Sequence, residues 1–175
     1  MESIKKKSNI SKKTRILVSS ALFASLICIS TAYLLHIPVG SAGYIHIGDT
    51  FIYLAAALLP TPYAALAAAI GGGLADILTG SANWVMATII IKPILVLFFT
   101  SKGKKIINTR NVIGAVVAGI VGTVLYMVAE GIMYGSFATA FVLSMVGLIQ
   151  PIGSFIVFII IGITFDKMKI KNILK

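Results

Sequence analysis

The chain has 175 residues, of which 58% are hydrophobic and 11% are charged, and its mean hydropathy is +1.02. A soluble domain is about one quarter charged, so this composition excludes an ordinary soluble enzyme or binding module. Apolar runs of about 20 residues recur along the chain, which is typical of a multi-spanning membrane protein, and they are too long for barrel strands. The net charge of +10 does not indicate nucleic-acid binding, because the basic residues cluster beside the apolar runs.

Six membrane-spanning helices are predicted along the chain. They cover residues 16–35, 47–59, 63–78, 84–100, 112–134 and 137–165. The second is short, and the sixth is long enough either to tilt or to contain a break at Pro151. The predicted fold is therefore an all-α bundle of six transmembrane helices. Its predicted parts are a basic segment over 1–15, a transmembrane domain over 16–166 and a basic tail over 167–175.

The basic residues predict the orientation of the bundle. Segments 5–15, 102–110 and 167–175 hold every Lys and Arg except Lys92. Basic segments beside spans stay in the cytoplasm, and an even number of spans agrees with both ends being inside. We therefore expect a multi-pass protein of the cell membrane with N-in/C-in topology. The loops at 36–46, 79–83 and 134–136 would then lie outside.

Four ionisable residues fall at membrane depth, where charge is costly and each such residue suggests a functional site. They are Asp49, Asp76, Lys92 and Glu130. On the predicted topology the three acids share the outer half of the bundle. Other polar or aromatic candidates are His46, Asn83, Trp84, Tyr126, Tyr134 and Gln150. Together they predict an outward-open pocket for a small molecule, closed toward the cytoplasm by apolar helix.

Two interpretations stay open for several of these residues. Lys92 either faces a ligand or pairs with an acid to hold two helices together. Trp84 and Tyr134 either line the pocket or sit as anchors at the membrane surface. Asp76 shares a helix face with Gly72 and Gly80, which favours a helix-packing role for all three.

Known catalytic and metal-binding patterns do not occur. There is no Walker A motif, no Gly-x-Ser-x-Gly elbow and no His-Glu-x-x-His. His36 and His46 do not stand at metal-ligand spacing, and Cys28 is a single cysteine. Neither a metal site nor an enzymatic activity is predicted.

The first predicted span carries small residues four apart. Ser20, Ala24 and Cys28 form one line, and Ala21 and Ser25 form the next. Such faces let helices pack closely. The surface serves either packing within the bundle or docking of another membrane protein.

Several motifs together resemble the S components of energy-coupling factor (ECF) transporters. They are Gly48-Asp49, the turn at Pro60, the line Gly72, Asp76 and Gly80, and "IIIKP" around Lys92. These S components are six-helix membrane subunits that capture vitamins from outside the cell. The resemblance extends mainly over residues 43–95 and is closest to the riboflavin and hydroxymethylpyrimidine branch, which also includes queuosine-precursor transporters.

The resemblance implies partners for the chain. A coupling membrane subunit would contact the first helix, and two ATPase subunits would use ATP, so the chain itself needs no cofactor. On that pattern Ser20, Ala21, Ala24 and Ser25 would face the coupling subunit. The pocket chemistry suits a small neutral or weakly basic nitrogen heterocycle better than a polyanion, because only Lys92 is basic at depth. A self-sufficient transporter with a proton relay is the alternative, and an intramembrane enzyme lacks any supporting motif.

Overall fold

A computed structural model describes residues 2–34, 37–38 and 44–174 of the chain, with side chains described over 12–34 and 46–172. The helices are α1 (Glu2–Ala32), α2 (Asp49–Leu58), α3 (Thr61–Leu78), α4 (Val85–Val96), α5 (Thr109–Tyr134), α6 (Phe137–Gly147), α7 (Ile149–Lys167) and α8 (Ile170–Leu174). A 3₁₀ turn, η2 (Ala82–Trp84), leads into α4. Strands β1 (Ile37–Pro38) and β2 (Tyr44–Ile45) pair antiparallel between α1 and α2. Most of the predicted outer loop at 36–46 otherwise lies outside the described residues.

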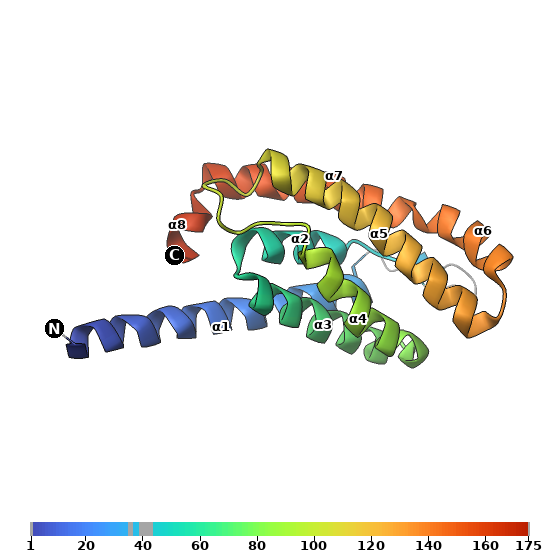
Figure 1. Cartoon of the computed structure of the whole chain (residues 1–175), viewed down its shortest axis with the longest axis horizontal. Coiled ribbons are helices and arrows are strands. Elements are labelled where there is room, and N and C mark those ends of the chain that lie inside the picture. Colours follow the sequence, from blue (N-terminus) through green and yellow to red (C-terminus); the bar gives the residue numbers. More distant parts are fainter. Residues whose placement is uncertain (1, 35–36, 39–43, 175) are drawn as a thin grey trace.

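The long helices run roughly along one common direction, and α7 continues the direction of α6 (Figure 1). Four helical segments are long and apolar enough to cross a membrane, namely Lys12–Ala32, Thr61–Leu78, Thr109–Tyr134 and Phe137–Lys167. The predicted all-helical membrane class is therefore confirmed. The number of six crossings stays a prediction, because Asp49–Leu58 and Ala82–Val96 are shorter.

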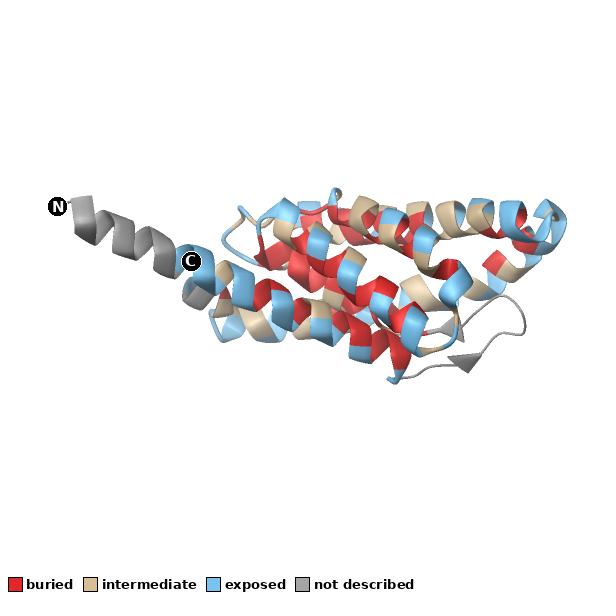
Figure 2. Ribbon diagram, turned by 90° about the horizontal axis from the view of Figure 1, so that it is seen from below, coloured by how far each residue is buried: buried red, intermediate tan, exposed pale blue. Residues whose placement is uncertain are grey.

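The short helix α2 lies inside the bundle and has almost no lipid-facing surface. Only Phe51 among its ten residues is not buried. It packs against α1, α3, α4 and α7, and Figure 2 shows buried residues concentrated along the interior of the bundle. Ten helical residues extend about 15 Å, roughly half of the hydrocarbon thickness. α2 is thus a core helix whose backbone is shielded by its neighbours.

The last long segment contains the break that was predicted near Pro151, but one turn earlier. α6 ends at Gly147, Leu148 lies between the helices, and α7 begins at Ile149. Proline has no backbone N–H, and its ring crowds the carbonyl four residues before it. For Pro151 that carbonyl belongs to Gly147. The helix therefore breaks at the residue whose carbonyl the proline ring crowds, and not at the proline itself.

Helix α1 packs on α3 through part of its small-residue surface. Ser20 is buried and Ala24 half-buried, and a Cβ placed on Gly71 of α3 would lie 2.5 Å from the carbonyl oxygen of Ala24. Ala24 therefore packs on the chain's own α3, and Ser20 has little exposed surface, whereas their contact with a coupling subunit stays a prediction. Ala21 and Ser25 remain exposed on the neighbouring line.

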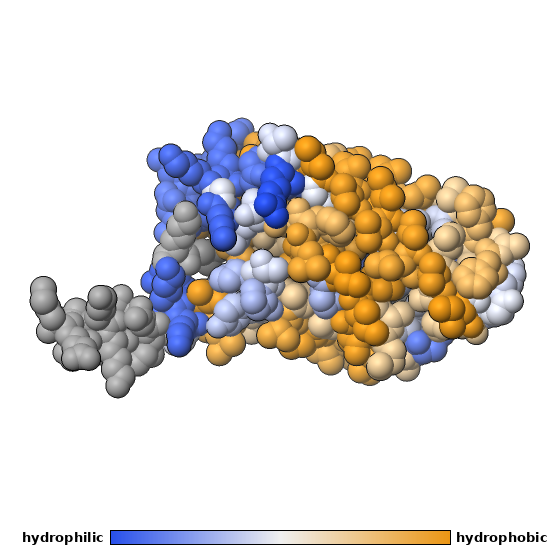
Figure 3. All heavy atoms as spheres, viewed as in Figure 1, coloured by the Kyte–Doolittle hydropathy of each residue, from blue (hydrophilic) through white to orange (hydrophobic). Residues whose placement is uncertain are grey.

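One end of the molecule is polar, and a hydrophobic belt covers the middle of the face seen in Figure 3. Both termini lie toward this polar end (Figure 1). The loop between α4 and α5 is held there by Asp166 of α7, whose two carboxylate oxygens accept hydrogen bonds from the backbone N–H groups of Ile106 (2.7 Å) and Ile107 (3.0 Å). Exposed basic residues at this end are Lys102, Lys104, Lys105, Arg110, Lys167 and Lys169.

The belt consists of large apolar side chains on the outer faces of the long helices. On α3 they recur at Leu66, Ile70 and Leu74, and α7 continues the same pattern with isoleucines. Exposed apolar area of this extent is unfavourable in water and is typical of a lipid-facing surface.

Candidate functional site

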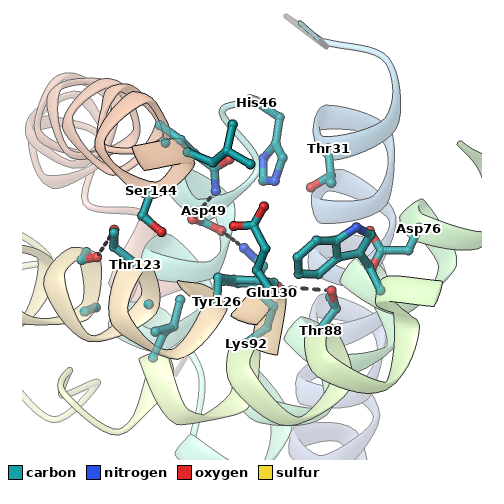
Figure 4. Close-up of a pocket in the computed structure, with 18 residues that line it drawn as sticks. Thr31, His46, Asp49, Asp76, Thr88, Lys92, Thr123, Tyr126, Glu130 and Ser144 are labelled. Atoms are coloured by element: carbon teal, nitrogen blue, oxygen red, sulfur yellow. Dashed lines mark hydrogen bonds and ion pairs between the residues drawn. The ribbon is translucent and has the colours of Figure 1, made fainter. Parts of the chain in front are cut away.

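A cavity of about 140 Å³ opens among the helices of the bundle, and α1 to α7 each contribute at least one residue to its lining. It lies where α2 and α4 begin and where α1 and α5 end, away from the basic segments (Figures 1 and 4). Seven of the nine residues predicted to bind substrate line it. These are His46, Asp49, Trp84, Lys92, Tyr126, Glu130 and Gln150.

The floor of the cavity is a buried ion pair. Lys92 Nζ of α4 lies 2.5 Å from Asp49 Oδ1 at the start of α2, and both side chains are buried. The second carboxylate oxygen of Asp49 accepts a hydrogen bond from Gln150 Nε2 of α7 at 3.0 Å. A buried ion pair is tolerable when its remaining hydrogen-bonding capacity is filled in this way. Lys92 therefore pairs with an acid, as one of the two interpretations proposed, and the pair also lines the cavity.

Aromatic rings form one wall. Trp84 and Tyr126 have ring centroids 5.9 Å apart, and the ammonium of Lys92 lies 5.1 Å from the centroid of Tyr126. The Tyr126 hydroxyl donates to Thr88 Oγ1 at 3.0 Å, which fixes the ring (Figure 4). Trp84 is only 8% exposed, so it packs inside the protein instead of lying in the membrane-surface belt. The wall offers flat apolar faces of the kind on which a planar ring stacks.

His46 reaches the cavity from the segment before α2. Its Nδ1 accepts a hydrogen bond from the backbone N–H of Gly48 at 2.9 Å. That bond assigns the proton of the neutral ring to Nε2. Because it follows β2 directly, His46 connects the outer hairpin with the first turn of α2 and Asp49. Among the described residues, no group of three or more His, Cys, Asp and Glu side chains is arranged to hold a metal ion.

Glu130 of α5 extends into the cavity, which His46 and Lys92 also line (Figure 4). Its side chain is buried at 6% exposure. Within the part of the chain that the structure describes, its Oε1 has no hydrogen-bond partner. It therefore differs from Asp49, whose charge is paired.

Two of the predicted binding residues lie outside the cavity lining. The Asn83 amide donates to the Tyr134 hydroxyl at 3.4 Å, and both residues are exposed. Tyr134 is the last residue of α5, one turn beyond Glu130, and its ring lies 6.4 Å from that of Trp84. The pair covers the outer edge of the aromatic wall, which fits the membrane-surface alternative considered for Tyr134.

The predicted line of Gly72, Asp76 and Gly80 is only partly a packing surface. A Cβ on Gly72 would lie 2.8 Å from Thr88 Cγ2, so Gly72 does allow α3 to approach α4. Gly80 was wrongly assigned to packing, because it lies after the end of α3 with φ of +76° and nothing within 4 Å of an added Cβ. Its role is to adopt a left-handed turn. Asp76 is buried and lines the cavity.

Four hydroxyl residues in the lining were not predicted. They are Thr31, Thr88, Thr123 and Ser144. The sequence held a signal for one of them, because Trp84, Thr88 and Lys92 recur at spacing four and so share one helix face. On α5, Thr123 lies about one turn before Tyr126, on the helix face that lines the cavity.

Comparison with known proteins identifies the family. The family model described as ECF-type riboflavin transporter, S component, matches residues 11–169. A protein of Pyrococcus woesei, described as an uncharacterized protein in gap 3' region, is 32% identical over 108 residues, which cover 60% of this chain and 72% of that protein. No solved structure matches the chain. The resemblance predicted from the motifs is confirmed, and the chain is a transporter subunit and not an enzyme. It belongs to the S-component family of ECF-type riboflavin transporters.

Proposed function

We propose that this S component captures a small vitamin or vitamin-precursor heterocycle in the cavity between α4 and α5. The observation that carries the proposal is the pairing of a flat aromatic wall, Trp84 and Tyr126, with a polar floor built on Asp49 and Lys92. The wall supplies stacking area, and the floor supplies orientation. Candidate substrates are hydroxymethylpyrimidine, pyridoxine, riboflavin and queuosine-precursor types.

The proposed orientation places the basic end in the cytoplasm and the cavity toward the outside, with six crossings and N-in/C-in topology. Support comes from the gathering of the basic loop and both termini at one end, which the positive-inside rule assigns to the cytoplasm. The buried helix α2 counts as a crossing on this view, because neighbouring helices and not lipid surround it.

Delivery into the cell would require a coupling subunit and two ATPase subunits. Below the Asp49–Lys92 pair the described core is closed by apolar and aromatic side chains. Tyr53 stacks on Phe99 at 5.1 Å, and Phe158 meets both rings edge-on at 5.9 Å. This layer supports a binding subunit over a self-sufficient transporter, because a proton relay would have to cross it. We propose that the coupling subunit meets the exposed line of Ala21 and Ser25 on α1.

Two measurements test the proposed function. Mass spectrometry of the purified chain should find a copurified heterocycle. Uptake of that compound should need cells that also express the coupling and ATPase subunits. Uptake by the chain alone under a proton gradient would contradict the proposal and favour the self-sufficient transporter.

A further inference from the structure

The charges around the cavity do not balance. Three carboxylates line it, from Asp49, Asp76 and Glu130, against the single ammonium of Lys92. Lys92 is already committed, because it lies 2.5 Å from Asp49 and over the ring of Tyr126. The Asp49–Lys92 pair is therefore neutral as a unit. The remaining formal charge in the lining is negative.

Glu130 is the carboxylate through which this excess negative charge would act on a ligand. It is 94% buried, given its 6% exposure, and it points into the cavity (Figure 4). Oε1 has no hydrogen-bond partner among the residues described. A buried carboxylate oxygen without a donor is destabilised relative to one in water. A ligand that brings an N–H donor with positive charge would remove that penalty.

The aromatic wall fits the same ligand. Trp84 and Tyr126 present ring faces at the cavity, and such faces attract cations as well as planar rings. Tyr126 already holds the Lys92 ammonium near its ring. The cavity of about 140 Å³ is close to the roughly 150 Å³ that accommodates one benzene-sized ring.

From these observations we propose that the substrate is a planar, single-ring cation whose protonated amine or amidine-type nitrogen donates hydrogen bonds to Glu130. The inference rests on the proposed function, since it names the ligand class of the same cavity. It excludes anionic ligands, and it ranks a neutral compound below its cationic isostere.

The test uses benzamidine and benzamide, which have nearly the same shape and differ in charge. Trp84 is the only tryptophan of the chain, so its fluorescence reports on the cavity without a label, and calorimetry of the full chain in detergent gives affinities. Charge-assisted hydrogen bonds are about twice as strong as neutral ones, so benzamidine should bind about tenfold or more tighter than benzamide. Glu130→Gln should reduce that preference to about onefold to threefold while the circular dichroism spectrum is unchanged.

The matched control is Glu2→Gln, the same substitution at the start of α1, which should leave the preference intact. Equal affinity for the two compounds in the parent protein, or a preference that survives Glu130→Gln, would overturn the inference. If either result is accompanied by tight binding of neutral hydroxymethylpyrimidine or riboflavin, the proposed function stands and the cation assignment alone falls. If none of these compounds binds and no small molecule copurifies, both fall together.

Discussion

At the scale of single residues, Lys92 illustrates how one side chain serves stability and binding together. Its ammonium is buried, lies 2.5 Å from Asp49 and contacts the Tyr126 ring. Lys92→Met would leave the Asp49 carboxylate buried without its partner charge. We expect a loss of about 3–5 kcal/mol in unfolding free energy, as for other broken buried pairs. Thermal unfolding in detergent measures this effect.

The double variant Asp49→Leu/Lys92→Met is the control for Lys92. Replacing both charges by apolar groups of similar size is often neutral. The double variant should therefore recover most of the stability lost in Lys92→Met, although it lacks the polar floor. If the double variant is as unstable as the single one, the lost stability comes from the absence of the ion pair itself and not from the unpaired carboxylate.

Tyr126 separates the contribution of a ring from that of a hydroxyl group. Tyr126→Phe keeps the face beside Trp84 and removes only the hydrogen bond to Thr88. We expect it to weaken ligand affinity by about fivefold, in line with one neutral hydrogen bond. Tyr126→Leu removes the ring and should cost more than about tenfold if stacking contributes as aromatic pairs do.

Calorimetry with the compound identified in the purified protein measures both Tyr126 variants. Thr88→Val serves as the control, since it deletes the acceptor of the same hydrogen bond from the opposite side. Thr88→Val should weaken ligand affinity by about the same factor as Tyr126→Phe. Equal losses in the Phe and Leu variants would exclude a stacking role for the ring.

At the residue level, the sequence could identify most of the side chains that line the cavity, whereas their contact with a ligand stays a prediction. Asp49, Lys92 and Glu130 could be selected because charge at membrane depth is costly. Gly80 was misassigned because it lies in the turn between α3 and α4, where a spacing of four no longer implies a shared face. The binding role of Asn83, which lies in the same turn and outside the cavity lining, stays a prediction. The pairing of Lys92 with Asp49 could not be predicted uniquely, since several acids were possible partners.

At the scale of elements, α1 presents two neighbouring lines of small residues that the structure separates. Ala24 packs on α3, whereas Ala21 is exposed. We expect Ala21→Trp to leave ligand binding unchanged and to reduce uptake with the coupling and ATPase subunits at least about tenfold, because a bulky ring blocks close helix approach. Uptake assays and calorimetry on the same variant measure the two effects.

Ala24→Trp provides the contrast for α1. The added ring would have to enter the contact between Ala24 and Gly71, so it should lower the unfolding temperature as overpacked cores do. Ala21→Trp should leave the unfolding temperature unchanged. Normal uptake by Ala21→Trp would remove this face of α1 from the docking proposal.

Element lengths were the part of the fold that the sequence predicted least well. The pattern of apolar residues located a helix in each of the six predicted spans, but α2 and α4 are shorter than the predicted spans 47–59 and 84–100. It missed α8, which lies in the predicted basic tail, and the extension of α1 back to Glu2. Hydropathy reports burial in general and does not distinguish lipid from protein surroundings. The nearly complete burial of α2 by its neighbours satisfies the same apolar pattern without a full-length span.

At the scale of the whole molecule, the separation of charge along the bundle predicts its orientation. The exposed lysines and arginines of the loop after α4 and of the end of α7 gather at one end, and the cavity opens elsewhere. Anionic lipid headgroups attract such clusters at the cytoplasmic surface. This arrangement followed from the sequence, because clustering of basic residues needs no tertiary information.

Cysteine labelling in whole cells measures that orientation directly. The single native cysteine, Cys28, is buried and can be replaced with alanine to give a silent background. Ala82→Cys, before α4, and Ala138→Cys, at the start of α6, lie at exposed positions beside the cavity end. We expect a membrane-impermeant maleimide to label both in intact cells, because the positive-inside rule places them outside.

Lys104→Cys, on the basic loop, should react only after permeabilisation. Labelling of Lys104→Cys in intact cells would place the basic end outside, and the cavity would then face the cytoplasm, where it could not capture a nutrient from the medium.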